Sequence, residues 1–161
     1  MHFSLIDRIE SIESGKHIVA TKSLSLAEEY LRDHFPKFPV MPGVLMLEAL
    51  TQASAWLVRE TDQFAHSLVV LKEARAVKYA RFVQPGQTLR LAATIVKTEN
   101  DLITLKTEGT LEGQTNLKAQ LILQKYNLAD NNPTQDEVDK KIIAIMKQQF
   151  KLLYKNNTEN L

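Results

Sequence analysis

Residues 43–60 restrict the possible folds more than any other segment, because their apolar side chains are spread around the whole circumference of a helix. The segment follows Pro42, and proline is common at helix starts. Its apolar residues are Val44, Leu45, Met46, Leu47, Ala49, Leu50, Ala53, Ala55, Trp56, Leu57 and Val58. A helix that is apolar on all sides is buried on all sides. The rest of the chain is therefore expected to wrap around it.

Antiparallel strands are predicted to supply that wrapping. Alternating or β-rich apolar runs occur at residues 15–25, 68–71, 88–95, 103–111 and 117–123. Short turn sequences such as Pro85-Gly86 and Glu112-Gly113 separate the later runs, and such spacing is typical of an antiparallel meander. The pattern predicts an α+β domain of the hot-dog type, in which an antiparallel β-sheet wraps around a long central helix.

A C-terminal amphipathic helix is expected to follow this domain. The predicted division is a hot-dog domain at residues 1–128 and a linker plus helical extension at residues 129–161. Thr134 and Glu137 match a capping box at the helix start. Helical spacing then places on one stripe Val138, Ile142, Ile145, Met146, Gln149 and Leu153. This stripe needs a partner, for which the body of the domain, a neighbouring subunit and a membrane surface are the alternatives.

Composition excludes several functional classes. The formal net charge of +1 does not favour nucleic acid as a partner, and the absence of cysteine excludes disulfides, thiolate metal sites and a cysteine nucleophile. No apolar run approaches the roughly 20 residues that a membrane span needs. The first residues lack a basic region followed by an apolar core, so no signal peptide is expected. A cytoplasmic protein is predicted.

The loop before the helix contains a candidate acid/base site. Prolines at every third position stiffen this loop after His34, and a neutral imidazole is a suitable general base. Glu48 lies inside the apolar helical run, where a carboxylate is costly unless it is paired or protonated. The Gly43 N–H lies at the positive end of the helix and can bind an oxyanion. A structural Glu48–Gln52 pair and a structural histidine are the alternative interpretations.

The segment from His34 to Gln52 resembles the signature of the β-hydroxyacyl-acyl carrier protein dehydratases of bacterial fatty acid synthesis. It reads His-Phe-Pro-x-x-Pro-Val-Met-Pro-Gly-Val-Leu-x-x-Glu-Ala-Leu-x-Gln. Residues 78–89 also resemble the family's strand that leads into a Pro-Gly turn. The similarity covers residues 5–126. Asp33 and Lys37 stand where the family usually has glycine.

The resemblance implies a mechanism in which His34 is the base at C2 and Glu48 is the acid that protonates the departing hydroxyl. The Gly43 N–H would polarise the thioester carbonyl. Other residues expected around the substrate are Val44, Gln52, Phe35 and Phe38. In the family the histidine and the glutamate of one site come from two subunits, so a homodimer or a trimer of dimers is implied. No metal or nucleotide cofactor is implied, because the acyl group arrives on a phosphopantetheine arm.

Basic residues near the second motif suggest a docking surface for an acidic acyl carrier protein. They are Lys72, Arg75, Lys78 and Arg81, with Lys37 as a further member. A solvated strand edge is the alternative, since edge strands often carry lysine. For the chain as a whole, a hot-dog acyl thioesterase and a non-catalytic acyl-thioester-binding protein are the competing functions.

Overall fold

The computed structural model describes residues 3–155. Residues 1–2 and the last part of the predicted extension, residues 156–161, lie outside the described part. The strands are β1 (Arg8–Glu13), β2 (His17–Ser23), β3 (Leu68–Tyr79), β4 (Thr88–Glu99), β5 (Leu102–Leu111) and β6 (Gln114–Tyr126). They form one sheet in the order β1-β2-β4-β5-β6-β3, and every neighbouring pair is antiparallel.

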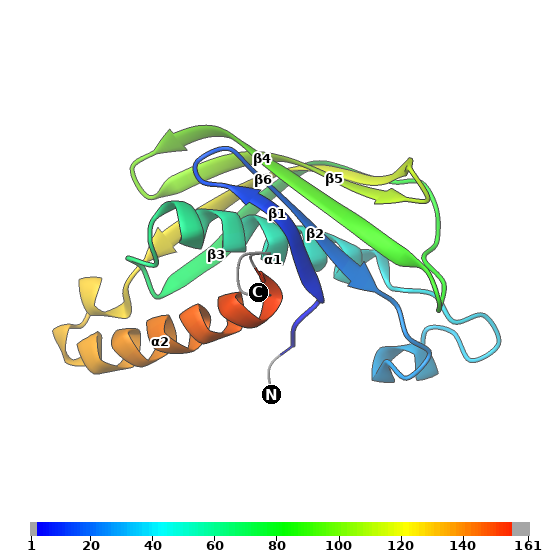
Figure 1. Ribbon diagram of the computed structural model, residues 1–161, viewed down its shortest axis with the longest axis horizontal. Coiled ribbons are helices and arrows are strands. Elements are labelled where there is room, and N and C mark those ends of the chain that lie inside the picture. The colour runs from blue at the N-terminus through cyan, green and yellow to red at the C-terminus, as the bar shows by residue number, and fades with distance from the viewer. Residues whose placement is uncertain (1–2, 156–161) are drawn as a thin grey trace, which may run out of the picture.

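The central helix, α1 (Gly43–Thr61), lies against the inner face of this sheet, which arches over it in Figure 1. Leucines from both layers meet in the core and are fully buried, among them Leu50, Leu57, Leu91, Leu105 and Leu121. Burial of such side chains contributes about 1.5–3 kcal/mol each relative to exposure. The predicted hot-dog architecture is thereby confirmed.

The prediction that the helix is buried on all sides is wrong for its first turns. Val44 is 71% exposed, and Glu48 and Gln52 are half-buried. The physical reason is that one sheet covers one side of a helix. The opposite side of the first turns of α1 needs another partner to be covered.

The turns follow the predicted positions. Between β5 and β6 only Glu112 and Gly113 intervene, with φ of 52° and 76°. Positive φ at both central residues is what a tight two-residue hairpin turn requires. Asn100, at the turn between β4 and β5, also has a positive φ of 55°.

Strand β1 was not predicted, because its apolar residues do not alternate. Ile9 and Ile12 are three residues apart, and the register against β2 shifts between Ile9 and Ser11. The extra residue of such a bulge lets both isoleucines turn inward although they are out of period-2 register. Ile9 is 2% exposed.

The C-terminal helix is present as α2 (Asp136–Leu153), but its start differs from the prediction and its packing face differs in part. A short 3₁₀ helix, η3 (Pro133–Gln135), precedes it, and the Asn132 side chain accepts the Thr134 N–H of η3 at 3.2 Å. Thr134 therefore does not cap α2, which begins after Gln135 without a side-chain cap.

The face of α2 that contacts the domain confirms the predicted stripe in part, because Met146 and Leu153 pack against the core. Val138 and Ile145 are exposed, whereas Phe150 packs against Trp56 and Phe64 at ring-centroid distances of 6.0 and 5.5 Å. In Figure 1 α2 lies on the side of α1 that faces away from most of the sheet. Of the three predicted alternatives, the body of the domain is the partner that the structure shows.

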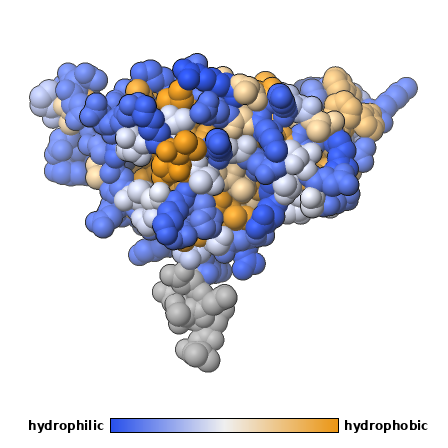
Figure 2. All heavy atoms as spheres, turned by 90° about the horizontal axis from the view of Figure 1, so that it is seen from above, coloured by the Kyte–Doolittle hydropathy of each residue, from blue (hydrophilic) through white to orange (hydrophobic). Residues whose placement is uncertain are grey.

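Several large apolar side chains remain on the surface. On the face seen in Figure 2, hydrophobic side chains form separate patches among hydrophilic ones. Phe82 is 62% exposed, and the edge strand β3 exposes Val70 and Leu71. Within residues 3–155 no helix has the length and apolar character needed to cross a membrane.

Asp139 anchors α2 and is 4% exposed. Its carboxylate accepts hydrogen bonds from the Ser67 hydroxyl and from the Leu128 and Ala129 N–H groups, the last two at 2.9 Å. Desolvation raises the pKa of Asp139, but these hydrogen bonds outweigh it, so the pKa is lowered from its ordinary value. The ionised form is therefore the one that holds α2 in place.

Replacing Asp139 with asparagine is expected to destabilise the docked helix at neutral pH, because one carboxylate oxygen becomes an NH₂ group that faces a donor. A lowered folded pKa means that the stabilisation is present above the ordinary pKa of 3.8 and is lost as the pH falls below it. The melting temperature of Asp139→Asn should lie below that of the wild type at pH 7, and the two should converge only once the pH has fallen below the lowered pKa of the folded protein. Asp136→Asn, on an exposed position of the same helix, is the control. Equal melting temperatures at pH 7 would contradict this role.

Candidate active site

His34 is held in a hydrogen-bonded loop that follows η1 (Glu29–Arg32). Its Nδ1 lies 2.9 Å from the Val40 carbonyl oxygen, and the Val40 N–H donates to the His34 carbonyl oxygen at 3.0 Å. Phe35 and Phe38 exchange two further backbone hydrogen bonds. Because a carbonyl oxygen only accepts, Nδ1 carries the proton, and Nε2 of the neutral ring is left with a free lone pair. This is the tautomer that a general base at Nε2 needs.

The His34 side chain opens into a cavity of about 320 Å³ at the start of α1. Gly43 lines the same cavity, and its N–H belongs to the first helical turn, whose N–H groups have no acceptor within the helix. The predicted base and the predicted oxyanion donor therefore line one space. The other lining residues are Met41, Met46, Tyr79, Ala80, Arg81 and Phe82.

Tyr79 explains why position 43 is glycine. A Cβ atom added at Gly43 would lie 3.2 Å from Cε1 of the Tyr79 ring. Burial raises the pKa of the Tyr79 hydroxyl, so the ring stays neutral against the helix start. Tyr79 and Gly43 line the same cavity.

Glu48 is paired with Gln52, as the spacing predicted. Gln52 Nε2 donates to Glu48 Oε1 at 2.9 Å and to the Phe3 carbonyl oxygen at 3.0 Å. Gln52 Oε1 accepts the Leu5 N–H at 2.8 Å. One amide thus fixes the orientation of the carboxylate and holds the N-terminal segment against α1.

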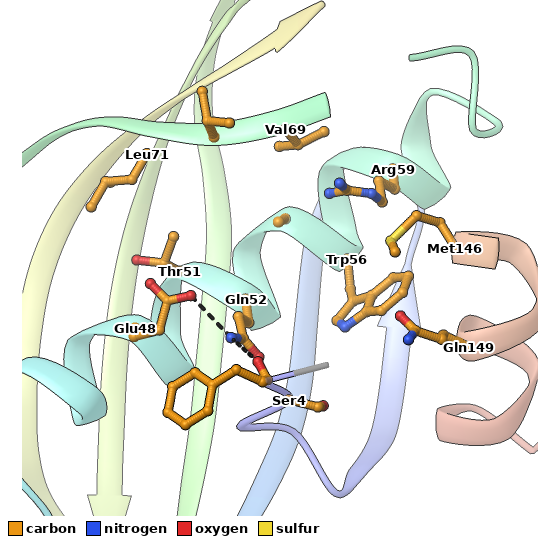
Figure 3. A pocket seen from close by; sticks show the side chains of 13 residues that line it. Ser4, Glu48, Thr51, Gln52, Trp56, Arg59, Val69, Leu71, Met146 and Gln149 are labelled. Atoms are coloured by element: carbon orange, nitrogen blue, oxygen red, sulfur yellow. Dashed lines mark hydrogen bonds between the residues drawn. The ribbon is translucent and has the colours of Figure 1, made fainter. Parts of the chain in front are cut away.

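Glu48 and Gln52 line a second cavity, of about 400 Å³, which Figure 3 shows from close by. It extends along α1 to Trp56 and Arg59, and Val69 and Leu71 of β3 lie on another side. Met146 and Gln149 reach it from α2. The cavity has an acid at one end and mainly apolar walls.

The structure does not bring His34 and Glu48 together within one chain. Because successive helical residues are rotated by about 100°, Gly43 and Glu48 point in directions about 140° apart around α1. His34 and Gly43 therefore share one cavity, while Glu48 and Gln52 share the other. Each cavity holds only part of the predicted catalytic set.

The remaining predicted substrate-binding residues are on the surface. Val44 is 71% exposed at the start of α1. Phe35 is 51% and Phe38 46% exposed, and the Phe38 ring meets Phe82 edge-on at 5.8 Å. Phe35 and Phe38 belong to the loop that carries His34, and Val44 lies in the first turn of α1.

The predicted docking residues do not form one cluster. Arg81 lines the His34 cavity, whereas Lys78 lines a different hollow with Lys106 and Lys118. Arg75 is bonded to Glu73 at 2.6 and 2.8 Å. Lys72 and Lys37 are exposed. The bulge between Arg75 and Lys78 pairs them with Gln120 and Lys118, two residues apart on β6, whereas Arg81 lies beyond the end of β3 at Tyr79.

Sequence reasoning missed two parts of the site. One is the N-terminal segment at Phe3 and Leu5, whose contact with Gln52 is made by backbone atoms and leaves no sequence signal. The other is the wall formed by α2. The sequence predicted that this amphipathic helix needs a partner, but not that it lines the cavity. Within residues 3–155, no group of three or more His, Asp or Glu side chains is arranged to hold a metal ion.

The family model of the FabA-like domain matches residues 1–120 of this chain, and the chain belongs to that family. Curated relatives narrow the assignment. The 3-hydroxyacyl-[acyl-carrier-protein] dehydratase FabZ of Oenococcus oeni is 36% identical over 118 residues, covering 73% of this chain and 85% of that protein. The FabZ of Janthinobacterium sp. (strain Marseille) is 35% identical over 80% of this chain and 85% of its own length. The chain is thus a member of the FabZ dehydratases, which confirms the resemblance found in its motifs.

Solved structures support the fold. A chain of the dehydratase heterocomplex ApeI:P from Xenorhabdus doucetiae superimposes with a TM-score of 0.66 at 18% identity, covering 83% of this chain and 90% of that one. The smu.793 protein of Streptococcus mutans, solved with acetyl CoA, gives a TM-score of 0.57 at 17% identity over 78% of this chain and 91% of its own.

Replacing Gln52 with leucine is expected to release both Glu48 and the N-terminal segment. The Leu5 N–H would lose its acceptor while Leu5 itself is 1% exposed, and an unsatisfied buried donor costs about 1–3 kcal/mol. Chemical unfolding should show this loss, and hydrogen exchange at the Leu5 amide should become faster. Gln148→Leu, at an exposed position, is the matched control. Unchanged exchange at Leu5 would show that the Gln52 bond does not hold the segment.

Proposed function

We propose that this chain removes water from a β-hydroxyacyl thioester and produces the trans-2-enoyl thioester, with the acyl group carried by an acyl carrier protein. The observation that carries the proposal is the shared cavity of His34 and Gly43, which is lined by an imidazole whose Nδ1 is bonded to the Val40 carbonyl oxygen and by the first residue of α1. Abstraction of a proton next to a carbonyl needs these two groups, because the base takes the proton and the N–H stabilises the oxyanion that results.

In the proposed reaction His34 Nε2 takes the proton from C2, and the Gly43 N–H binds the thioester oxygen as negative charge develops on it. The C2–C3 double bond then forms while the C3–O bond breaks. Glu48 donates a proton to the departing hydroxyl, which leaves as water. The hydrogen bond from Gln52 keeps the other Glu48 oxygen free for this role.

A second copy of the chain is part of this proposal, because one copy does not place Glu48 beside His34. The edge strand β3 ends the sheet and exposes Val70 and Leu71, and unpaired edges are templates for pairing with another chain. The exposed side of α1 at Val44 also lacks a cover. We propose a homodimer in which Glu48 of one copy completes the His34 cavity of the other. A trimer of dimers and a cytoplasmic location stay predictions.

Arg81 and Lys37 are the basic residues that we propose for contact with the carrier protein or its phosphopantetheine phosphate. Arg81 lines the His34 cavity, and Lys37 lies in the exposed loop that follows His34. Arg75 is less suited, because Glu73 already neutralises it. Lys78 stays a weaker prediction, since it faces the separate hollow.

Substitution of either catalytic residue is expected to abolish hydration of crotonyl-CoA, the reverse of the proposed reaction. His34→Ala and Glu48→Gln should each reduce kcat by about 10²–10⁴-fold, the usual contribution of an acid or base, with little change in melting temperature. Loss of enoyl-thioester absorbance measures the reaction. An inactive wild type, tried with carrier-bound substrates too, would overturn the proposal, and release of free thiol would point to thioester hydrolysis instead.

The shared site makes a second, independent prediction. Coexpressed in equal amounts, His34→Ala and Glu48→Gln should recover about a quarter of wild-type activity, because half of the dimers are mixed and one of the two symmetric sites in each is intact. Each variant alone serves as its own control. If the mixture stays as inactive as its components although mixed dimers are isolated by two affinity tags, both residues act from one chain.

A further inference from the structure

Helix α2 lies beyond the part of the chain that the family model matches, yet it forms a wall of the Glu48 cavity. The matched residues end at 120, and α2 begins at Asp136. Met146 and Gln149 of α2 line the cavity together with Glu48 and Trp56. In Figure 3 both α2 side chains lie near the Trp56 ring, at the end away from Glu48.

The cavity follows one face of α1 from the acid to this wall. Glu48, Gln52, Trp56 and Arg59 recur at intervals of three or four residues and line the same space. The rise per residue gives about 12 Å from Glu48 to Trp56 along the helix axis. A chain that reacts at Glu48 and follows α1 therefore meets Trp56, Met146 and Gln149 next.

Two side chains at this end of the cavity, Trp56 and Arg59, are largely buried. Burial lowers the pKa of the Arg59 guanidinium to about 10. Its Nε is buried and finds no hydrogen-bond acceptor among residues 3–155. Its guanidinium carbon lies 5.9 Å from the centroid of the Trp56 ring. The Trp56 ring is the apolar surface that an alkyl chain would contact at this end.

The wall is docked at both ends, so it is a built part of the domain. Near its start, Asp139 is bonded to Ser67 at the entry to β3 and to the backbone that follows β6. Near its end, the Phe150 ring packs between Trp56 and Phe64. The residues that line the cavity lie between these two attachments.

We infer that α2 is the length stop of the acyl-binding cavity, and that Met146 and Gln149 determine the longest acyl chain that the enzyme accepts. The inference rests on the proposed function, because it takes the acyl chain to extend from Glu48 along α1. Residues on the opposite side of the helix, such as Ile145, which is 41% exposed, have no part in it.

The test compares kcat/KM for hydration of trans-2-enoyl-CoA substrates of increasing chain length, from four to about sixteen carbons. Consider the shortest substrate that the wild type no longer accepts. For this substrate, Met146→Ala and Gln149→Ala should each raise kcat/KM, relative to that for the four-carbon substrate, by about tenfold or more. Met146→Trp should shift the limit to shorter chains. Because Met146 also packs against the core, Gln149→Ala keeps the test independent of a folding defect.

Ile145→Ala is the matched control and should leave the chain-length profile unchanged. Identical profiles for the wild type, Gln149→Ala and Met146→Trp would overturn the inference, and so would the same shift in Ile145→Ala.

Fluorescence separates this inference from the proposed function. Trp56 is the only tryptophan of the chain and lines the cavity, so saturated acyl-CoAs that reach the α2 end should change its emission. Chain-length-dependent binding that shifts in Gln149→Ala, with no hydration activity in the wild type, would overturn the function and keep the length stop. If the wild type hydrates enoyl-CoAs, but neither the Trp56 signal nor the chain-length profile changes in the α2 variants, the proposed function is kept and the length stop is overturned.

Discussion

The direction in which side chains leave α1 is the constraint on which the rest of the molecule depends. The helix is buried against the sheet on one side through Leu50, Ala53 and Leu57. Its remaining surface carries Gly43 and Glu48, whose directions differ by about 140°. Two positions this far apart around one helix cannot both contact the reacting atoms of one substrate. The proposed chemistry therefore needs a second copy of the chain, and the exposed Val44 marks the side of the helix that such a copy would cover.

Two polar side chains organise the surroundings of this helix, and both do so by satisfying backbone groups. Gln52 joins Glu48 to the N-terminal segment, and Asp139 joins α2 to the turn after β6 and to Ser67. In each case the buried donors would be costly if they were left unpaired. The N-terminal segment before β1 and helix α2 consequently become walls of the Glu48 cavity, although neither is part of the sheet.

The elements with regular patterns were predictable because burial imposes a period on the sequence. β5 alternates throughout and β4 and β6 alternate over most of their length, and α1 has apolar residues on its buried side, so their types and approximate bounds follow from the sequence. β1 escaped notice because a bulge breaks its alternation at Ile9. The start of α2 was misplaced because Thr134 belongs to a 3₁₀ turn capped by Asn132. Its packing face was predicted in part: Met146 and Leu153 pack against the core, but Ile145 is exposed and Phe150 contacts Trp56 and Phe64.

The sequence by itself determined the features that depend only on neighbours in the chain. These are the His34 loop, the helix start at Gly43 and the Glu48–Gln52 pair. The motif that places the chain among the FabZ dehydratases is equally local. Tertiary structure decided what could not be local. It put Tyr79 against Gly43, divided His34 and Glu48 between two cavities, separated Arg81 from Lys78 and brought α2 to the end of the Glu48 cavity. These contacts join residues far apart in the chain, and their energies depend on how whole elements pack, which no short segment encodes.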